Sequence, residues 1–378
     1  MSKLFEEFRL GDATLKNRVV MAPLTRSRAP NDAADERVAL YYMQRATAGL
    51  IVSEGTPISR EGQGFLFNPG IFTAEQIAGW RLTTNSIHSV GGKIFAQIWH
   101  VGRVSHPSIQ EGGKLPVSAT TKQPVGATAY GYDADGFPAL LEPPAPRQLT
   151  TEEITRIVCE FAQAAENAVQ AGFDGVEIHG ANGYLFEQFM NPLVNDRTDQ
   201  YSAGALADRI RFTLEVIDAV VAKIGASRVG IRISPYGQLF DMPLYDEIDE
   251  TYTELTAQIG ARQLAYVHIM DQSGYPAPAP GTEGGGGDPK ETFINLLSTM
   301  KSKLPNTAVI LAGGMTRARA EELINDGVID LAAFGTPYIS NPDLVERLKN
   351  KWPLAEANRE TFYGGGAQGY IDYAPHQG

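Results

Sequence analysis

Three side chains with donatable hydrogens lie at or just beyond the short apolar segment 175–179, namely His179, Asn182 and Tyr184. Side chains alternate between the faces of a strand, so His179 points away from the apolar layer to which Ile178 belongs. An imidazole and an amide donate hydrogen bonds to a carbonyl or nitro oxygen, and a phenol can give a proton to carbon. The spacing therefore predicts a site that polarises the carbonyl or nitro oxygen of a ligand and transfers a proton to one of its carbon atoms. A hydrolytic triad is disfavoured, because it needs a serine nucleophile and an orienting carboxylate. Taken alone, His179 would more often be a structural residue with a satisfied hydrogen bond.

The elements that must position these groups are eight short apolar segments separated by helical patterns. In one such pattern Thr150 and Glu153 form a capping box before an apolar stripe over residues 154–169. Strands that alternate with helices build a parallel sheet, and eight units favour a closed (β/α)8 barrel over an open, doubly wound sheet. The predicted strands are residues 18–22, 50–53, 93–99, 175–179, 229–234, 266–270, 308–312 and 331–334.

The whole chain, residues 1–378, is predicted to form one domain, because it has neither a GxGxxG fingerprint nor a separate dinucleotide-binding unit. Residues 100–148 are rich in Pro, Gly and Thr without a helical period. We expect them to form a long insertion after the third strand, which could act as a lid. Residues 274–289 are expected to be a mobile loop. Their run of glycines lacks the Lys and Ser or Thr of a P-loop, so we assign them no nucleotide role.

The composition is that of an ordinary globular protein, with 43% hydrophobic and 20% charged residues among 378. A net charge of −12 argues against a nucleic-acid partner or an anionic membrane surface, since both need a basic face. No apolar run is long enough to span a bilayer, and acidic residues stand where a signal peptide has its apolar core. We therefore expect a cytoplasmic protein that is a monomer or a homodimer.

The single cysteine, Cys159, excludes an intrachain disulfide and a cysteine-rich zinc site. No metal site is expected. A lone thiol suits a reducing cytosol. Cys159 lies between Ile157 and Phe161 in a helical pattern, which predicts a packed thiol in the core or on its flank.

Polar side chains occupy the inward face of several predicted strands near their carboxyl ends, where a barrel has its active site. Alternation puts Gln97 and Trp99 opposite their apolar neighbours, and it isolates Arg232 and His268 in otherwise apolar strands. Each alone could be an internal hydrogen-bonding residue, and Glu177 is expected to be the ion-pair partner of Arg232. Together they favour a flat, electron-accepting ring whose negative charge an arginine could stabilise.

The last two strands end in glycine, which indicates a phosphate site. Gly313 and Gly314 follow the seventh strand, and Gly335 and Thr336 follow the eighth. Backbone amides exposed there, with a helix starting at Thr316, form the kind of phosphate cradle that many barrels use. A barrel that holds a flat ring near its first five strands and a phosphate near its last two matches flavin mononucleotide.

Several motifs spread along the chain resemble those of the old yellow enzyme family of flavin-dependent ene-reductases, in particular its classical bacterial branch, where Thr25 stands in place of another branch's cysteine. The resemblance covers essentially the full chain. The motifs are residues 15–26 (LKNRVVMAPLTR), 97–103 (QIWHVGR), 179–184 (HGANGY) with 191–192 (NP), and 362–367 (FYGGGA).

The resemblance implies FMN bound in the barrel, with defined roles for polar residues. Thr25 would hydrogen-bond the flavin carbonyl nearest the hydride-carrying nitrogen and thereby tune its potential. Gln97 would hold the pyrimidine side of the ring, and Arg232 would stabilise the reduced, anionic flavin. The residues expected along the edge of the flavin are Ala22, Pro23 and Gly55.

The resemblance also implies a two-stage reaction at one site, with NADH or NADPH as reductant and a small activated alkene as substrate. The substrate would take hydride at its β carbon, while His179 and Asn182 bind its carbonyl or nitro oxygen and Tyr184 protonates the other carbon. Nitro compounds and nitrate esters are further expected substrates. The apolar wall is expected to contain Phe65, Trp99 and Tyr363.

One position departs from the family pattern: many relatives carry Arg after the glycine of the eighth strand, where it pairs with the FMN phosphate, but this chain has Thr336. Arg317 is the candidate to replace that charge. Two other functions stay open from the residues alone. A non-flavin barrel enzyme on phosphorylated substrates needs a strand-end Lys or a carboxylate base, and Glu177 is the inward carboxylate we find. A flavin-binding protein without turnover would not need His179 or Tyr184.

Overall fold

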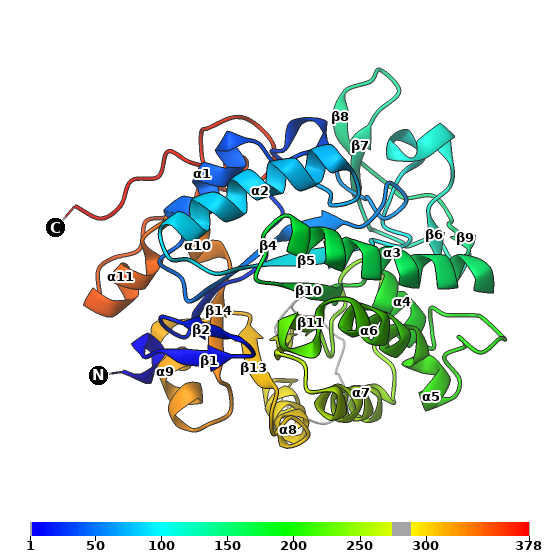
Figure 1. The fold of residues 1–378 in the computed structure, drawn as a ribbon. Helices are drawn as coiled ribbons and strands as arrows, with labels where there is room; N and C mark the ends of the chain where they lie inside the picture. Colours follow the sequence, from blue (N-terminus) through cyan, green and yellow to red (C-terminus); the bar gives the residue numbers. More distant parts are fainter. Residues whose placement is uncertain (1, 274–288, 378) are drawn as a thin grey trace, which may run out of the picture.

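A computed structural model of the chain describes residues 2–273 and 289–377. Eight parallel strands close into a barrel in the order β10-β11-β12-β13-β14-β3-β4-β5 (Figure 1). The predicted (β/α)8 fold is therefore confirmed, and each predicted strand overlaps one strand of the barrel. The barrel strands are β3 (Val19–Met21), β4 (Leu50–Pro57), β5 (Ile94–Trp99), β10 (Gly175–Gly180), β11 (Val229–Ile233), β12 (Tyr266–Met270), β13 (Ala308–Ala312) and β14 (Leu331–Phe334).

Helices surround the barrel, and the predicted capping box before α3 is present, with Thr150 and Glu153 exchanging hydrogen bonds. The helices are α1 (Glu36–Gln44), α2 (Ala74–Ser89), α3 (Thr151–Gln170), α4 (Leu185–Met190), α5 (Leu206–Arg209), α6 (Arg211–Ile224), α7 (Ile248–Arg262), α8 (Pro289–Ser302), α9 (Arg317–Asn325), α10 (Thr336–Ser340) and α11 (Leu344–Asn350). Short 3-10 turns are η1 (Lys3–Phe5), η2 (Pro30–Asp32), η3 (Pro107–Ile109), η4 (Glu111–Gly113), η5 (Ala226–Arg228) and η6 (Arg359–Thr361).

The apolar core has two layers, one between the barrel and its helices and one inside the barrel. The inner layer contains side chains such as Val52, Phe95 and Ile310, which point inward from alternate positions of their strands. Leu10 and Leu15, from the antiparallel hairpin of β1 (Phe8–Leu10) and β2 (Ala13–Leu15), belong to the same layer. This hairpin packs at the amino-terminal end of the barrel, where Asp12 accepts a hydrogen bond from Ser227, just before β11.

The predicted insertion after β5 is present and carries β structure of its own. Two short strands pair in parallel, β6 (Val117–Ser118) with β9 (Arg147–Gln148). Between them β7 (Ala129–Tyr132) and β8 (Pro138–Leu141) form an antiparallel hairpin that projects from the body of the molecule (Figure 1). A β-bridge between Phe65 and Tyr130 attaches this hairpin to the barrel loops. The glycine-rich loop expected at residues 274–289 lies, except for Pro289 in α8, outside the described residues.

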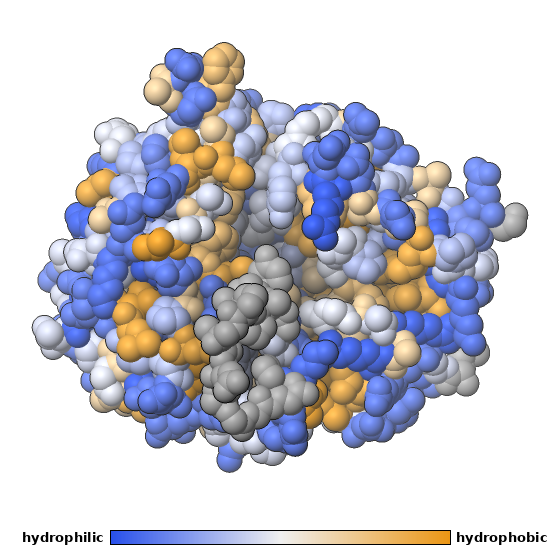
Figure 2. All heavy atoms as spheres, turned by 180° about the vertical axis from the view of Figure 1, so that it is seen from behind, coloured by the Kyte–Doolittle hydropathy of each residue, from blue (hydrophilic) through white to orange (hydrophobic). Residues whose placement is uncertain are grey.

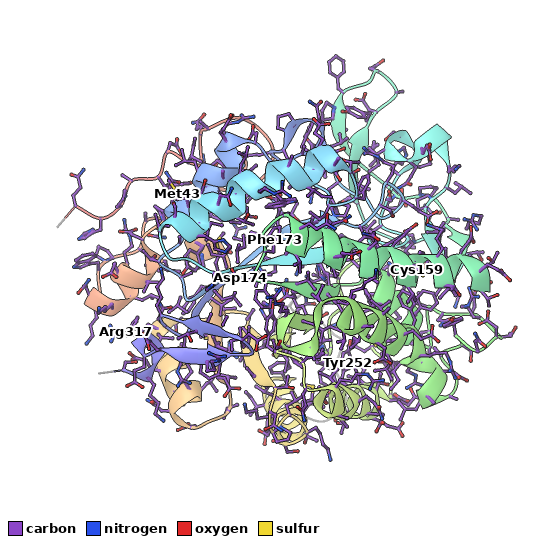
Figure 3. The ribbon with its side chains drawn as sticks, viewed as in Figure 1. Met43, Cys159, Phe173, Asp174, Tyr252 and Arg317 are labelled. Carbon is purple, nitrogen blue, oxygen red and sulfur yellow. The ribbon has the colours of Figure 1, made fainter. Side chains whose placement is uncertain are left out.

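On the face shown in Figure 2, hydrophilic side chains are spread among hydrophobic ones, as the composition leads one to expect. Among the described residues no helix is long and apolar enough to cross a membrane, and no group of His, Cys, Asp and Glu is arranged to hold a metal ion. The prediction of a packed Cys159 was wrong, because this thiol is exposed on the outer face of α3 (Figure 3). The helical phase explains this: Cys159 is two residues from the buried Ile157, which places it on the opposite side of the helix.

Candidate active site

The inward polar side chains lie in neighbouring positions of the barrel, because the strand register aligns them. Gln97 is paired with Glu177 across β5 and β10, and His179, Arg232 and His268 form one row across β10, β11 and β12. All of them are buried. The predicted alternation of inward and outward side chains is therefore confirmed. The parallel pairing of the strands brings the inward polar side chains together in one cluster.

Glu177 lies at the centre of this cluster, but its partners differ from the prediction. Its carboxylate accepts from Gln97 Nε2 at 2.8 Å and lies 2.8 Å from His268 Nδ1, so the predicted ion pair with Arg232 was wrong. The register explains the difference, since Glu177 is level with Gly230 and Arg232 lies two pairs further along, level with His179. Burial alone would raise the pKa of Glu177, but His268, Arg232 and Gln97 together hold it below its ordinary value.

Arg232 is left with unused hydrogen-bonding capacity that faces the cavity. Its Nη2 atom lies 3.3 Å from the Met270 sulfur, and its Nε atom has no partner among the described residues. The same is true of the buried Trp99 Nε1 and His179 Nδ1 atoms. Buried donors without partners are rare in folded proteins, so these atoms indicate that a polar ligand binds here.

A cavity of about 660 Å³ opens at this end of the barrel, a size typical of cofactor and substrate sites. It brings together most of the predicted site residues. Those that line it are Pro23, Thr25, Gly55, Phe65, Gln97, Trp99, His179, Asn182, Tyr184, Arg232, Thr336 and Tyr363.

The remaining predicted residues, Ala22, Gly313, Gly314 and Gly335, lie outside the cavity wall. Ala22 packs in the inner apolar layer. Gly313 has φ +108, and a Cβ there would lie 2.3 Å from the Asp271 carbonyl oxygen, so packing already requires glycine. At Gly314 and Gly335 a Cβ would meet the nearest protein atom only at 3.6 Å, which leaves both backbones open to a close approach by a ligand.

The sequence reasoning missed other wall residues, some beside predicted ones and some from segments distant in the chain. The insertion supplies part of the wall, the loop after β11 supplies Phe240, and the carboxyl-terminal segment supplies Phe362 beside the predicted Tyr363. Aromatic residues within the otherwise polar insertion were a signal that could have indicated Tyr130. The missed wall residues are Leu24, Ser27, Thr128, Tyr130, Leu140, Phe240, Ile339 and Phe362.

Trp99 is the centre of the aromatic part of the wall. Its ring stacks on Phe65 and His179 at centroid distances of 5.6 and 5.7 Å, and it meets Tyr184 edge-on at 4.9 Å. A Cβ at Gly55 would come within 2.3 Å of the indole, so glycine is needed for Trp99 to lie there. The stacked rings fix the orientation of both His179 and Tyr184.

Burial sets the protonation states of the two candidate catalytic side chains. It raises the pKa of Tyr184 far above its ordinary value, with Tyr363 adding to the effect, so the phenol stays protonated and can act as an acid. Burial lowers the pKa of His179 well below its ordinary value, and the charges of Arg232 and His268 lower it further. His179 is therefore a neutral imidazole, which offers an N–H donor and leaves the fixed positive charge to Arg232.

The loop that carries Asn182 is anchored by the buried carboxyl of Glu187. Gly183 N donates to Glu187 Oε2 at 2.5 Å, and Ser234 Oγ donates to Oε1 at 2.5 Å while accepting from Asn182 N at 2.8 Å. Tyr252, on α7 (Figure 3), donates to the same carboxyl at 3.0 Å. These bonds hold the left-handed backbone of Asn182 (φ +61) and Gly183 (φ +76). Despite them, burial raises the pKa of Glu187 to about 7.

We expect the free energy of unfolding to lose a contribution from Glu187 as pH rises from about 4.5 to about 7. The pKa is raised to about 7 from an ordinary value of 4.5, so the folded state favours the protonated form. Below pH 4.5 the contribution of Glu187 to the free energy of unfolding is fully present. Once the pH exceeds the folded-state pKa, the free energy of unfolding is lower by roughly 3 kcal/mol. The measurement is urea unfolding of the wild type and Glu187→Gln at a series of pH values. Parallel pH dependences would contradict the assignment.

The phosphate region lacks the charge expected from Arg317. That guanidinium donates to Glu321 at 2.9 Å and to the Leu348 carbonyl at 2.6 Å, and it lies over the Phe5 ring. Figure 3 shows Arg317 near the amino terminus, at the outer edge of the molecule. The prediction that Arg317 replaces the missing arginine was therefore wrong, whereas Thr336 itself lines the cavity.

Comparison with known proteins supports one family over nearly the whole chain. Residues 3–355 match the model of the NADH:flavin oxidoreductase / NADH oxidase family. The chain is 42% identical to 12-oxophytodienoate reductase 7 of Oryza sativa subsp. japonica, over 98% of this chain and 94% of that protein. It is 38% identical to 12-oxophytodienoate reductase 2 of Arabidopsis thaliana, over 98% and 95% of the two chains.

The fold has equally extensive matches among solved structures. Morphinone reductase in complex with tetrahydroNAD matches with a TM-score of 0.91 and 40% sequence identity, covering 99% of this chain and 98% of that chain. Another structure of morphinone reductase matches with a TM-score of 0.92, over 99% and 96% of the two chains.

Proposed function

Since the chain belongs to the NADH:flavin oxidoreductase / NADH oxidase family, that of the old yellow enzymes, we propose that it reduces activated alkenes with FMN as its cofactor and NADH or NADPH as its reductant. The observation that carries the proposal is the joint presence of His179, Asn182 and Tyr184 in one cavity with Arg232, whose Nε atom has no hydrogen-bond partner among the described residues. We propose α,β-unsaturated carbonyl compounds and nitroalkenes as substrates, with nitro compounds and nitrate esters as further ones.

The residues of the cavity fit FMN. FMN, when bound, accepts hydride from a nicotinamide and delivers hydride to carbon. Arg232, with its unpaired Nε atom, would hold negative charge on the ring, and Gln97, whose Nε2 is taken by Glu177, would offer its Oε1 to a ring N–H. Thr25 would donate its hydroxyl to a ring carbonyl. The open backbones of Gly314 and Gly335, together with Thr336, would receive the phosphate.

His179 and Asn182 would bind the substrate oxygen, and Tyr184 would complete the reaction. Two donors on one oxygen draw electrons from the conjugated alkene and make its β carbon accept hydride. Tyr184 would then donate its phenolic proton to the α carbon, for which its raised pKa keeps the proton in place. Phe65 and Trp99 would exclude water from one side of the alkene.

Nicotinamide and alkene would use the same face of the cavity in turn, which predicts ping-pong kinetics. Support comes from a relative, since morphinone reductase has been solved in complex with tetrahydroNAD. A second support is the topology. Among the described residues, the one large sheet is the closed barrel, and there is no separate dinucleotide-binding unit where a nicotinamide cofactor could bind instead.

A flavin-free barrel enzyme acting on a phosphorylated substrate is the other candidate function that the residues left open. Such an enzyme needs a lysine or a free carboxylate base at a strand end. The one inward carboxylate predicted, Glu177, is bonded to His268 and Gln97 instead of facing the cavity. The family match and this geometry favour the flavin enzyme.

The visible absorption spectrum of the purified protein tests the proposal. We expect a yellow chromophore that bleaches with NADPH or NADH in the absence of oxygen and recovers when cyclohexenone is added. Bleaching without recovery would leave a flavin oxidoreductase that does not use this alkene. A colourless protein that also fails to take up FMN would overturn the proposal.

We expect Thr336→Arg to tighten FMN binding by roughly tenfold, since it adds a charge-assisted hydrogen bond to the phosphate. The measurement is quenching of FMN fluorescence on titration with apoprotein. Thr128→Arg is the matched control, because it adds the same charge to another part of the cavity wall. Unchanged or weaker FMN binding by Thr336→Arg would show that this position does not reach the phosphate.

A further inference from the structure

The side chain of Asn182 starts from a fixed backbone but keeps one internal freedom. Its N–H is tied to Ser234, and the next N–H is tied to Glu187, so the position of its Cα is set by two bonds to a buried network. An amide group can still turn by half a rotation, which exchanges its oxygen and its NH2 group at almost no steric cost. The rotation of this amide therefore determines which group of Asn182 faces the cavity, the NH2 donor or the carbonyl acceptor.

Gln272 is the described residue that bonds the side-chain amide of Asn182. Its Nε2 atom donates to Asn182 Oδ1 at 2.6 Å. No described residue bonds the NH2 group of Asn182, whose side chain lines the cavity. Since the oxygen is held by Gln272, the NH2 group faces the space where a ligand binds.

Gln272 is itself held in place, although it does not line the cavity. It is 4% exposed and follows Asp271, whose N–H donates to the Ala312 carbonyl at 2.9 Å and whose carboxylate binds Arg319 at 2.7 Å. A Cβ at Gly237 would lie 2.7 Å from Gln272 Oε1, so that side of the amide is also confined. The Gln272 Oε1 atom is buried and accepts no hydrogen bond from the described residues, so packing and the bond to Asn182 are what orient the Gln272 amide.

We propose that Gln272 is a positioning residue that fixes Asn182 with its NH2 group toward the ligand and so gives the site its preference for hydrogen-bond-accepting oxygen. The inference rests on the proposed function, because it deepens the role of Asn182 in binding a carbonyl, nitro or phenolate oxygen. A turned Asn182 would present its carbonyl oxygen, which repels such ligands. Specificity would then depend on a side chain that never touches the substrate.

Gln272→Glu tests the proposal, because a carboxylate has a similar shape but only accepts hydrogen bonds. It would draw the NH2 group of Asn182 to itself and turn the carbonyl oxygen toward the cavity. The probe is para-chlorophenol, which is titrated into the oxidised holoenzyme while the long-wavelength charge-transfer band is followed. We expect its Kd to rise about 10- to 100-fold, as for the loss of a hydrogen bond to a charged ligand.

A double-mutant cycle separates this effect from simple charge repulsion. We expect Gln272→Glu to weaken phenol binding less than about twofold when Asn182→Ala is already present, because the amide through which it acts is gone. Gln272→Met, which is neutral, should weaken binding less than Gln272→Glu in the parent. Bound FMN and the melting temperature of each variant report whether the fold is retained.

The outcomes distinguish this inference from the proposed function. A wild-type holoenzyme without a charge-transfer band would count against the proposed site as a whole. With the band present, an unchanged or lower Kd in Gln272→Glu would overturn the role of Gln272. An equal rise of the Kd with and without Asn182 would also overturn it, since the carboxylate would then act by charge alone.

Discussion

Replacing Tyr184 with Phe is expected to slow alkene reduction by about 100- to 10,000-fold, the usual contribution of a positioned general acid. Flavin reduction by NADH or NADPH should stay within about twofold, because that step needs no proton from the phenol. The ring contacts of Tyr184 with Trp99 and Phe240 do not involve the hydroxyl, so phenylalanine should keep them. Stopped-flow absorbance of the two half-reactions, measured separately, checks the prediction.

Tyr130→Phe is the matched control, since it removes the hydroxyl of another tyrosine in the cavity wall. We expect it to change neither half-reaction by more than about twofold. Equal slowing of both half-reactions in Tyr184→Phe would contradict a proton-donor role and would indicate a disturbed cavity instead. Faster alkene reduction at low pH in Tyr184→Phe would show that solvent protons partly replace the phenol.

The double replacement of His179 and Asn182 with Ala is expected to abolish the charge-transfer colour of a bound phenol. Two hydrogen bonds to an anionic oxygen disappear, which should raise the Kd for para-chlorophenol by roughly 100- to 10,000-fold. The cavity wall keeps Arg232, so FMN should remain bound and the protein should stay yellow. A spectroscopic titration measures both properties in one experiment.

A comparison pair outside the cavity controls for the loss of two polar side chains. Asn350→Ala with His376→Ala removes the same residue types from α11 and the carboxyl-terminal segment, and we expect normal phenol binding. Colour that persists in the cavity double variant would place the oxyanion site elsewhere in the barrel. Loss of FMN together with the colour would assign the pair to cofactor binding.

The eight strands and the inward direction of the polar residues could be predicted from the sequence, because both depend on local periodicity. Gln97, His179 and Arg232 point inward since side chains alternate along each strand, whatever the strand is paired with. The same locality would have placed Cys159 correctly, had its helical phase relative to Ile157 been followed. Hydrogen bonds between side chains on different strands do not follow from local periodicity.

The partner of Glu177 could not be predicted because it depends on the register between strands. Alternation puts Glu177 and Arg232 on the same inward side, which made an ion pair plausible. The observed pairing sets Glu177 level with Gln97 and leaves its other oxygen to His268. An offset of two residues in the register between Glu177 and Arg232 thus leaves the Arg232 Nε atom without a partner among the described residues.

The loop-built wall of the cavity also needed the tertiary structure. The carboxyl-terminal segment reaches the site because Arg26 and Arg28 donate to carbonyls of that segment, at 2.8 Å to Gly369 and 2.7 Å to Thr361. These contacts join residues more than 300 positions apart, and no local pattern encodes them. Phe362 enters the wall as a consequence, beside the predicted Tyr363.

The barrel, the site at the carboxyl ends of its strands and the three residues proposed for catalysis could thus all be predicted from local patterns in the chain. Hydrophobic periodicity, turn residues and motif spacing are properties of short stretches of sequence, so they can be recognised without knowing which distant residues are in contact. The hydrogen bonds that hold those residues in place depend on the packing of distant elements. Glu187, Ser234 and Gln272 fix Asn182 from separate elements, and such bonds exist only after packing brings their donors and acceptors within about 3 Å.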